Sequence, residues 1–473
     1  MDLLAARRVP YMARRNFVIE LRHLIVWGVF AGLIEGTVSG VIVAKTFAAS
    51  DLLITVVTAT PAFANLVSLM WGALLVRRRK LPLLMALGAA CVGCILSVAF
   101  TPSTRWGGWM FAFQILLSRV FMSGVVTARA AIWRTNYPRS YRGRITARLQ
   151  IVRTLGSIPL ILGCGVLFDV HPHAYTWFYP LVGALGAVGL LMIRRLRIRG
   201  ERIREAPRAG NDDPEELADD LSERFSLPSL IRPWEVIARM RRALAADPRF
   251  ARYCAAQMCI GSANLMVINV NVIVLTKVLL LGYAASNSLI DLVPRVVMLA
   301  ALPMWARLFD RVGVLRFRVF NSACWSGSLI FCGLGALLAS GASNGGSPLF
   351  GTACGVYLFG RLIDGLAQSG GAIAWNIGHL HFAEDDKAEL YMGIHVSLTG
   401  LRGLSAPFIG LALYKLIGWG VFVVALGLAL MGLRLFARLA REERRLAASD
   451  AQEVEDRAGA RDRIGQPADL LRR

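Results

Sequence analysis

The chain has 473 residues, 56% of them hydrophobic, and a mean hydropathy of +0.53. A soluble protein of this length does not need so much apolar sequence, so the composition excludes an ordinary soluble domain. The net charge of +22 could indicate a nucleic-acid partner. The arginines, however, lie between the apolar segments and not in a separate basic domain, so we exclude nucleic acid and expect the lipid bilayer as a partner.

Apolar segments of about 20 residues recur along the chain, and this is the length that spans a bilayer core of about 30 Å. We expect membrane-spanning helices at 23–46, 52–76, 81–101, 108–131, 149–169, 175–193, 252–278, 284–306, 319–340, 349–376, 391–414 and 417–436. The eight cysteines fall in or at the ends of these segments. We interpret them as small packing residues, and we expect neither a metal site nor a cofactor.

The twelve segments divide into two sets of six, and short sequences recur in both sets. Met70-Trp71 at the end of the second segment is echoed by Met304-Trp305 at the end of the eighth. The spacing of Arg119 and Trp133 is likewise repeated by a second Arg and Trp in the other half. Such duplication is typical of transporters, whose substrate site lies between the repeats. The expected domains are an N-terminal half at 1–193, a central loop at 194–250, a C-terminal half at 251–437 and a charged tail at 438–473.

The distribution of Lys and Arg predicts the orientation, because cytoplasmic loops are enriched in these residues. One set of short connections is rich in arginine, whereas the other holds only Lys45, Arg105, Lys277 and Lys415. We therefore expect a multi-pass protein of the cytoplasmic (inner) membrane, with both termini and the central loop in the cytoplasm. Within the loop, residues 233–248 have helical apolar spacing. A tether with a surface helix is the simpler interpretation, and a regulatory or lipid-contact role is the alternative. The tail from about Arg438 is expected to be a fraying helix that leads into disorder.

These features resemble the major facilitator superfamily of secondary transporters. Its members carry a glycine, then Asp-Arg and further basic residues, after helix 2, and a second copy after helix 8. The inner-gate residues that match are Gly72, Arg77, Asp310, Arg311 and Gly313. Val76 stands where the first copy usually has Asp. In the family this Asp holds the inner loop against neighbouring helices in the outward-open state, so Asp310 is the better candidate for that role.

The resemblance implies an all-α polytopic membrane protein with twelve transmembrane helices in two pseudo-symmetric six-helix bundles. It also implies that helices 3, 6, 9 and 12 form an outer scaffold around the helices that line the cavity. The intramembrane charges agree with this arrangement, because helices 3, 6, 9 and 12 carry essentially none. Charges in the bilayer are costly and face protein, water or a partner. The candidate substrate-binding or coupling residues are Glu35, Arg119, Asp291, Arg295, Arg361, Asp364 and Arg402.

Each candidate has a structural alternative. Asp291 and Arg295 are four residues apart, and Arg361 and Asp364 are three apart, so each pair could be a local ion pair that only supports packing. Arg119 and Arg361 have matching depths in helices 4 and 10, and two guanidinium groups across a cavity suit a carboxylate or phosphate. The alternative for both arginines is hydrogen bonding to neighbouring helices.

Glu35 lies in the middle of helix 1 without a partner within one turn. A desolvated carboxylate of this kind could carry a coupling proton, whereas a satisfied structural hydrogen bond and direct substrate contact are the alternatives. We therefore expect a secondary active transporter that moves a small solute by alternating access and is not an enzyme. Protons are the candidate coupling ion, and the excess of arginine weakly favours an anionic or zwitterionic solute. The alternative is a protein of the same fold that does not transport and acts as a sensor or assembly partner.

Overall fold

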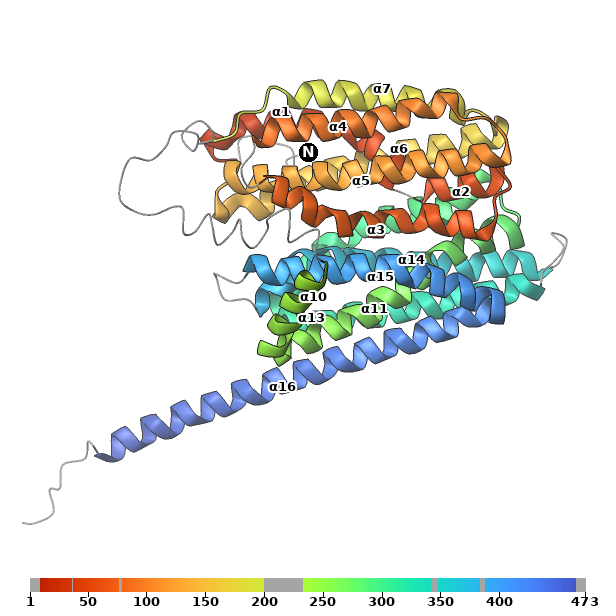
Figure 1. Cartoon of the computed structure of the whole chain (residues 1–473). Helices are drawn as coiled ribbons and strands as arrows, with labels where there is room; N and C mark the ends of the chain where they lie inside the picture. Colours follow the sequence, from red (N-terminus) through yellow and green to blue (C-terminus); the bar gives the residue numbers. More distant parts are fainter. Residues whose placement is uncertain are drawn as a thin grey trace, which may run out of the picture.

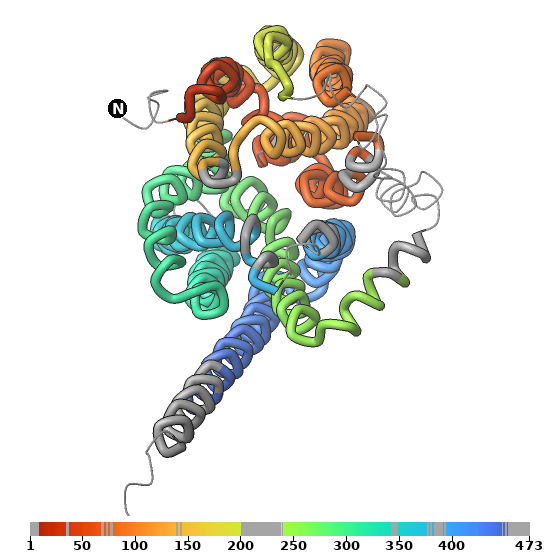
Figure 2. Tube along the Cα trace, turned by 90° about the vertical axis from the view of Figure 1, so that its left-hand side faces the viewer, coloured from red at the N-terminus to blue at the C-terminus, as the bar shows by residue number. Residues whose placement is uncertain are grey.

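The protein is a bundle of long helices in two layers, shown by the computed structural model in Figure 1. The structure describes residues 9–35, 37–75, 79–199, 233–341, 348–382 and 388–464. The N-terminal helices form one layer and the C-terminal helices form the other, and both views show the two groups side by side (Figures 1 and 2). The central loop at 200–232 lies outside the described residues.

The N-terminal half contains six membrane-spanning helices, of which the first is broken into α1 and α2. Its elements are α1 (Tyr11–Glu35), α2 (Val38–Thr46), α3 (Asp51–Leu75), α4 (Lys80–Leu96) with the 3₁₀ turn η3 (Ser97–Phe100), α5 (Arg105–Asn136), α6 (Arg139–Val170) and α7 (Tyr175–Ile193). We number the spanning helices 1 to 6 in this half and 7 to 12 in the other.

The C-terminal half contains the other six spanning helices and is preceded by the loop helix α10 (Pro233–Ala246). Its elements are α11 (Pro248–Ile273) with the π-helical turn η4 (Val274–Val278), α12 (Tyr283–Asn287) with the π-helical turn η5 (Ser288–Leu292), α13 (Val293–Gly341), α14 (Pro348–Ile377) with η6 (Gly378–His381), α15 (Ala388–Ile417) with η7 (Gly418–Gly420), and α16 (Val421–Ile464). The predicted twelve-helix, two-half architecture is confirmed.

Two ends of the bundle are distinguished below. The proximal end holds the start of α1, the loop helix α10 and the point where α16 leaves the bundle, whereas the distal end holds the end of α2 and the start of α3 (Figure 1). Helices 8 and 9 are joined within α13 at the proximal end. The chain turns there at Gly313, whose φ of +74° lies in the left-handed region that favours glycine.

The sequence predicted helix 1 as one uninterrupted span at 23–46, and this was wrong in detail. Helix 1 is broken, because α1 ends at Glu35 and α2 begins at Val38. Thr37 is the N-cap of α2, with φ −84° and ψ 0°. The break leaves unpaired backbone N–H groups in the middle of the bundle, and such groups need partners in a membrane.

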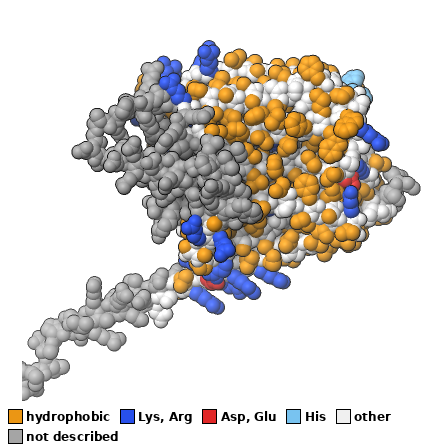
Figure 3. Space-filling model, viewed as in Figure 1, with side chains coloured by type: hydrophobic (Ala, Val, Ile, Leu, Met, Phe, Trp, Pro, Cys, Tyr) orange, Lys and Arg blue, Asp and Glu red, His pale blue; other side chains and the backbone are white. Residues whose placement is uncertain are grey.

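Large apolar side chains cover the exterior of the bundle, as Figure 3 shows between the basic groups at its two ends. Because lipid can accept this surface, the apolar exposure is expected of membrane-spanning helices. The described part of the chain contains nine helical segments long and apolar enough to cross a membrane; two of them, Tyr283–Gly341 and Ile394–Leu446, each join two spanning helices. Asp51–Val67 is a shorter apolar segment in α3.

Two segments outside the spans are helical. The helix expected near 233–248 is confirmed as α10, which ends at Ala246 before Asp247 caps α11. The tail from about Arg438 was expected to be a fraying helix that leads into disorder. Helix α16 continues without interruption to Ile464 and projects from the bundle (Figure 1), so the expected boundary at 438 lies within one helix.

Candidate functional site

The break in helix 1 is bound by a carboxylate from the other half of the molecule. The backbone N–H of Thr37 donates a hydrogen bond to Asp291 Oδ2 at 2.9 Å. Thr37 starts α2, and the free N–H groups and positive dipole end of a helix start stabilise an anionic partner. The contact joins helix 1 of the first half to helix 8 of the second, deep inside the bundle. It therefore couples a discontinuity in one repeat to a charged side chain of the other.

Helix 8 presents Asp291 from the π-helical turn η5. The Asp291 carboxylate also pairs with Arg295, with an Nη2–Oδ1 distance of 3.2 Å, and the two side chains are only 12% and 20% exposed. One turn earlier, Asn287 is buried, and neither its amide nitrogen nor its amide oxygen has a hydrogen-bond partner. The Thr37 hydroxyl is likewise buried and has no hydrogen-bond partner. Buried polar groups without a partner are uncommon and call for an explanation, such as a bound water molecule or ion.

Helix 10 supports this turn through Arg361. Its Nε donates to Leu289 O at 3.0 Å and its Nη2 donates to Ile290 O at 2.7 Å, and both carbonyls belong to η5. Arg361 also pairs with Asp364 at 2.9 Å. The guanidinium group of Arg361 therefore has partners on helices 8 and 10. This is the structural alternative to substrate binding, namely hydrogen bonding to a neighbouring helix.

Asp364 and Arg119 are both buried. Asp364 accepts a hydrogen bond from Gln368 Nε2 at 2.8 Å in addition to its ion pair. Arg119 lies on α5, in the first half of the molecule. A pair of arginines that bind one anion across the cavity is therefore disfavoured in this conformation, since Arg361 is already occupied.

Polar contacts close the distal end between the two halves. Lys277 at the end of helix 7 donates to Asp51 Oδ1 at 2.8 Å and to Ala49 O at 2.7 Å. Lys45 at the end of helix 1 donates to Leu281 O at 2.8 Å. These contacts join the distal ends of helices 1 and 2 to the connection between helices 7 and 8.

A second carboxylate at the distal end binds a helix start, as Asp291 does in mid-bundle. Asp169 at the end of helix 5 accepts hydrogen bonds from the backbone N–H groups of Tyr283 and Ala284, at 2.6 and 2.9 Å. Helices 5 and 8 touch here, because a Cβ added to Gly165 would lie 2.6 Å from the Ala284 Cα atom. Each half thus supplies one carboxylate to the start of a helix segment in the other.

The remaining predicted residues lie apart from this cluster. Arg402 on α15 is buried and donates to Gln257 O at 2.7 Å and to Thr399 Oγ1 at 3.1 Å. Asp310 and Arg311 are exposed at the proximal connection between helices 8 and 9, beside Gly313. Gly72 lies in α3, whereas Arg77 lies outside the described residues, as does the side chain of Glu35.

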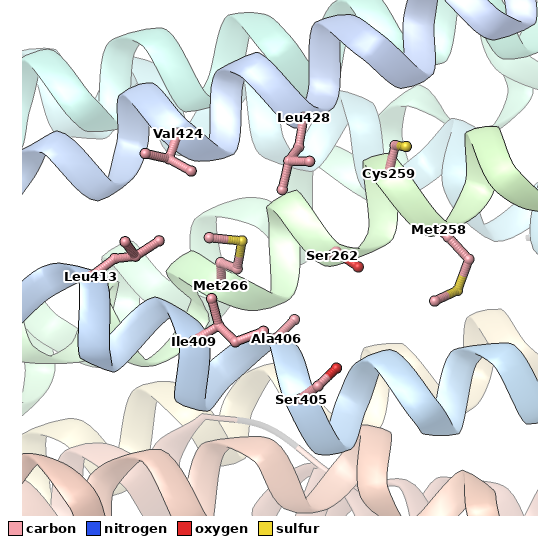
Figure 4. Close-up of a pocket in the computed structure, with 10 residues that line it drawn as sticks. All are labelled: Met258, Cys259, Ser262, Met266, Ser405, Ala406, Ile409, Leu413, Val424 and Leu428. Carbon is pink, nitrogen blue, oxygen red and sulfur yellow. The ribbon is translucent and has the colours of Figure 1, made fainter.

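One groove of 390 Å³ lies between α11, α15 and α16, as Figure 4 shows. Its lining includes Met258, Met266 and Leu428, and its hydroxyl groups are those of Ser262 and Ser405. The groove contains none of the predicted site residues. An apolar cleft between spanning helices suits a lipid chain better than a polar solute, so we do not place the site there.

The twelve helices, the two repeats and the polar contacts between them define the class of two-half membrane transport folds. A family model described as Major Facilitator Superfamily matches residues 24–357, and the chain belongs to this family. A comparison with curated protein sequences gives no match.

Solved structures of similar fold agree with this assignment. A POT family transporter in complex with a thioalcohol-conjugated peptide is 11% identical, with a TM-score of 0.66 over 92% of this chain and 99% of that chain. The nucleoside transporter NupG (a D323A mutant) is 12% identical, with a TM-score of 0.61 over 90% and 99%. A POT family transporter in complex with 5-aminolevulinic acid is 12% identical, with a TM-score of 0.62 over 90% and 96%. At these identities the likeness concerns the fold.

Proposed function

We propose that this protein is a secondary active transporter that moves a small solute by alternating access between its two halves. The observation that carries the proposal is the contact of Asp291 with the broken helix 1. A discontinuous helix whose ends face charged or polar groups at the repeat interface is the usual form of a transporter site. The buried, unpartnered polar atoms of Asn287 and Thr37 add hydrogen-bonding capacity at the same place.

Because cytoplasmic connections are enriched in Lys and Arg, the basic connections favour a cytoplasmic proximal end, and we infer an inner-membrane location. The closed distal end then faces outward, and the structure corresponds to a state that is closed to the outside. Asp310 is exposed at the proximal end in this conformation. That exposure suits a residue which, by resemblance to the family, holds the inner loop only in the opposite, outward-open state.

Solute and coupling are parts of the same proposal. Among the candidate charges, Asp291 pairs with Arg295 and Asp364 pairs with Arg361. The excess of arginine over carboxylates among the intramembrane charges of the sequence favours an anionic or zwitterionic solute. Glu35 is the last residue of α1 before the break. We assign the coupling proton to it, because a carboxylate at this depth in the membrane is costly when it is ionised.

Reconstituted liposomes test the proposal. A thermal-shift screen of the purified protein against metabolites identifies a ligand, and uptake of that ligand is then measured with and without a proton gradient. The parent protein should accumulate the solute, whereas Glu35→Gln should retain binding and exchange but lose accumulation, because an amide cannot titrate. Arg307→Gln, at an exposed proximal position, serves as the control variant. Accumulation by Glu35→Gln equal to that of the parent would remove the proton assignment.

A sensor or assembly partner of the same fold remains the second candidate function. It is favoured by one observation, namely the continuation of α16 as a helix far beyond the bundle. A projecting helix suits a protein contact. Saturable ligand binding without flux in either direction would select this candidate over transport.

A further inference from the structure

Two arginines of the C-terminal half lie against one face of α11. Tyr253, Gln257 and Gly261 share this face, because residues four apart lie above one another on a helix. Arg402 donates a hydrogen bond to Gln257 O. A Cβ atom added to Gly261 would lie 2.0 Å from Arg402 Nη1, so the guanidinium group fits here because Gly261 has no side chain. Arg318, from helix 9, lies over the Phe436 ring, and the centroid of that ring lies 5.6 Å from the centroid of the Tyr253 ring. Arg318 therefore approaches the same face of α11 one helical turn from the Gln257 carbonyl that binds Arg402.

Both cations are removed from solvent. Arg318 is 3% exposed and Arg402 is 8% exposed. Arg318 stacks over the Phe436 ring of helix 12 at 4.8 Å and donates to Asn321 Oδ1 at 3.2 Å. The Nε atoms of both arginines are buried without a hydrogen-bond partner. Two like charges in the interior of a membrane protein, with donors left over, are strongly unfavourable unless an anion compensates them.

The carboxylates described in this half are engaged elsewhere or exposed. Asp310 is exposed, and the others have partners as follows: Asp247 with Tyr391, Asp291 with Arg295, Asp364 with Arg361, Glu442 with Arg252, and Glu443 with His381. Among the side chains that the structure describes, the chain therefore supplies no carboxylate to Arg318 or Arg402.

The N-terminal half differs at the equivalent place. Helices 1 and 5 cross where Gly28 meets the backbone of Arg153, and helices 7 and 11 approach each other where Gly261 meets the side chain of Arg402. Eight residues before Gly28 stands Glu20, a buried carboxylate that accepts hydrogen bonds from Trp133 and Tyr137. Eight residues before Gly261 stands Tyr253. The first repeat thus carries a carboxyl group of its own here, whereas the described part of the second repeat has Tyr253 in its place.

We infer that Arg318 and Arg402 bind an oxyanion, namely a carboxylate or phosphate group, inside the C-terminal half. A guanidinium group is suited to such a group, because its planar N–H donors match two oxygen atoms. Each of the two arginines has an Nε–H donor without a partner, so together they can donate to two oxygen atoms of one anion. The site lies towards the proximal end, since Arg318 follows the Gly313 turn by five residues and Tyr253 follows the start of α11 by five. It is distinct from the contact between Asp291 and helix 1.

The test measures the unfolding temperature of the protein in detergent at increasing concentrations of inorganic phosphate and, in a separate series, of acetate. A bulky sulfonate salt replaces the omitted phosphate or acetate, so that the ionic strength stays constant. The parent should show a saturable rise with at least one of the two anions. Arg402→Gln and Arg318→Gln should each weaken the apparent affinity at least ten-fold. Both should unfold at a higher temperature than the parent when no oxyanion is present, because an uncompensated buried charge has been removed. Arg307→Gln, which is exposed, should respond as the parent does.

Three outcomes would overturn the inference: no saturable rise in the parent with either anion, an unchanged response in both Gln variants, or a lower unfolding temperature of both Gln variants without oxyanion. If a Gln variant does not fold, Arg402→Lys is measured instead, and unchanged affinity in it would refute bidentate binding. The relative response to phosphate and acetate tells which group the site prefers. Since the assay requires no transport, its result is independent of the liposome experiment.

Discussion

Replacing Asp291 by Asn should weaken the closure of the distal end. The carboxylate accepts a hydrogen bond from Thr37 across the two halves at 2.9 Å and pairs with Arg295 at 3.2 Å. A hydrogen bond to a charged group contributes about 1.5–3 kcal/mol and a neutral one about 0.5–1.5 kcal/mol. The exchange should therefore cost the closed state about 1–1.5 kcal/mol. Because about 1.4 kcal/mol is a factor of ten, the ratio of closed to open molecules should fall about 5- to 12-fold.

Spin labels at the distal end measure this ratio. Phe100 and Leu416 are exposed there, one in each half, so cysteines at these positions in a cysteine-depleted protein report the separation of the halves. Asp291→Asn should increase the population at the longer distance. Asp291→Asn alone leaves the charge of Arg295 without its carboxylate partner. The double variant Asp291→Asn with Arg295→Gln removes this charge as well and so tests the loss of the contact with Thr37 without an unpaired cation.

Asp51→Asn is the matched control for this experiment. Its ion pair with Lys277 also joins the halves but lies at the rim, with side chains 27% and 33% exposed. Pairs of this kind contribute about 0–1 kcal/mol, so the ratio should change less than about five-fold. An effect of Asp291→Asn no larger than that of Asp51→Asn, in both single and double variants, would refute the argument that the mid-bundle contact holds the halves together.

Three further outcomes are expected. Arg361→Gln should lower the unfolding free energy by about 3–5 kcal/mol, measured by thermal or denaturant unfolding, because it leaves a buried carboxylate without its cation; a loss below about 1 kcal/mol would contradict a structural role. Gly410→Val should reduce thermal stability, since even a Cβ there would lie 1.9 Å from Met266 O and force helices 7 and 11 apart; unchanged stability would show that this crossing is loose. Single cysteines at Phe100 and Arg307 should react with a membrane-impermeant thiol reagent from opposite sides of the membrane, and reaction of both from one side would exclude the proposed orientation.

The number of helices could be predicted from the sequence, because each spanning helix needs an apolar segment of about 20 residues. The duplication could be predicted because short motifs recur in both halves. The break in helix 1 could not, since Glu35-Gly36-Thr37 sits in a long apolar stretch that contains no proline. The cost of opening a helix there is offset by Asp291, which is distant in sequence. A carboxylate next to a glycine in a spanning segment was the available signal.

The role of Arg361 shows a second limit of the sequence. Its spacing from Asp364 predicted the ion pair correctly, and the structure confirms that contact. Its other partners are the carbonyl groups of Leu289 and Ile290, which become available because η5 is π-helical. Every residue has a backbone carbonyl group, so the sequence does not indicate which of them will accept a hydrogen bond from an arginine. The matching depths of Arg119 and Arg361 in helices 4 and 10 therefore could not show that the guanidinium group of Arg361 already has partners.

The length of α16 has a mechanical consequence. Its 44 residues correspond to about 66 Å of helix, roughly twice the thickness of a bilayer core. The part beyond residue 437 therefore extends about 40 Å from the body to which it is joined without a break. Such a helix acts as a lever: each 10° by which its half rocks would displace the tip by about 7 Å. A fluorophore near Ile464, paired with one on the opposite half, would thus convert a small rotation inside the membrane into a displacement readable in the aqueous phase.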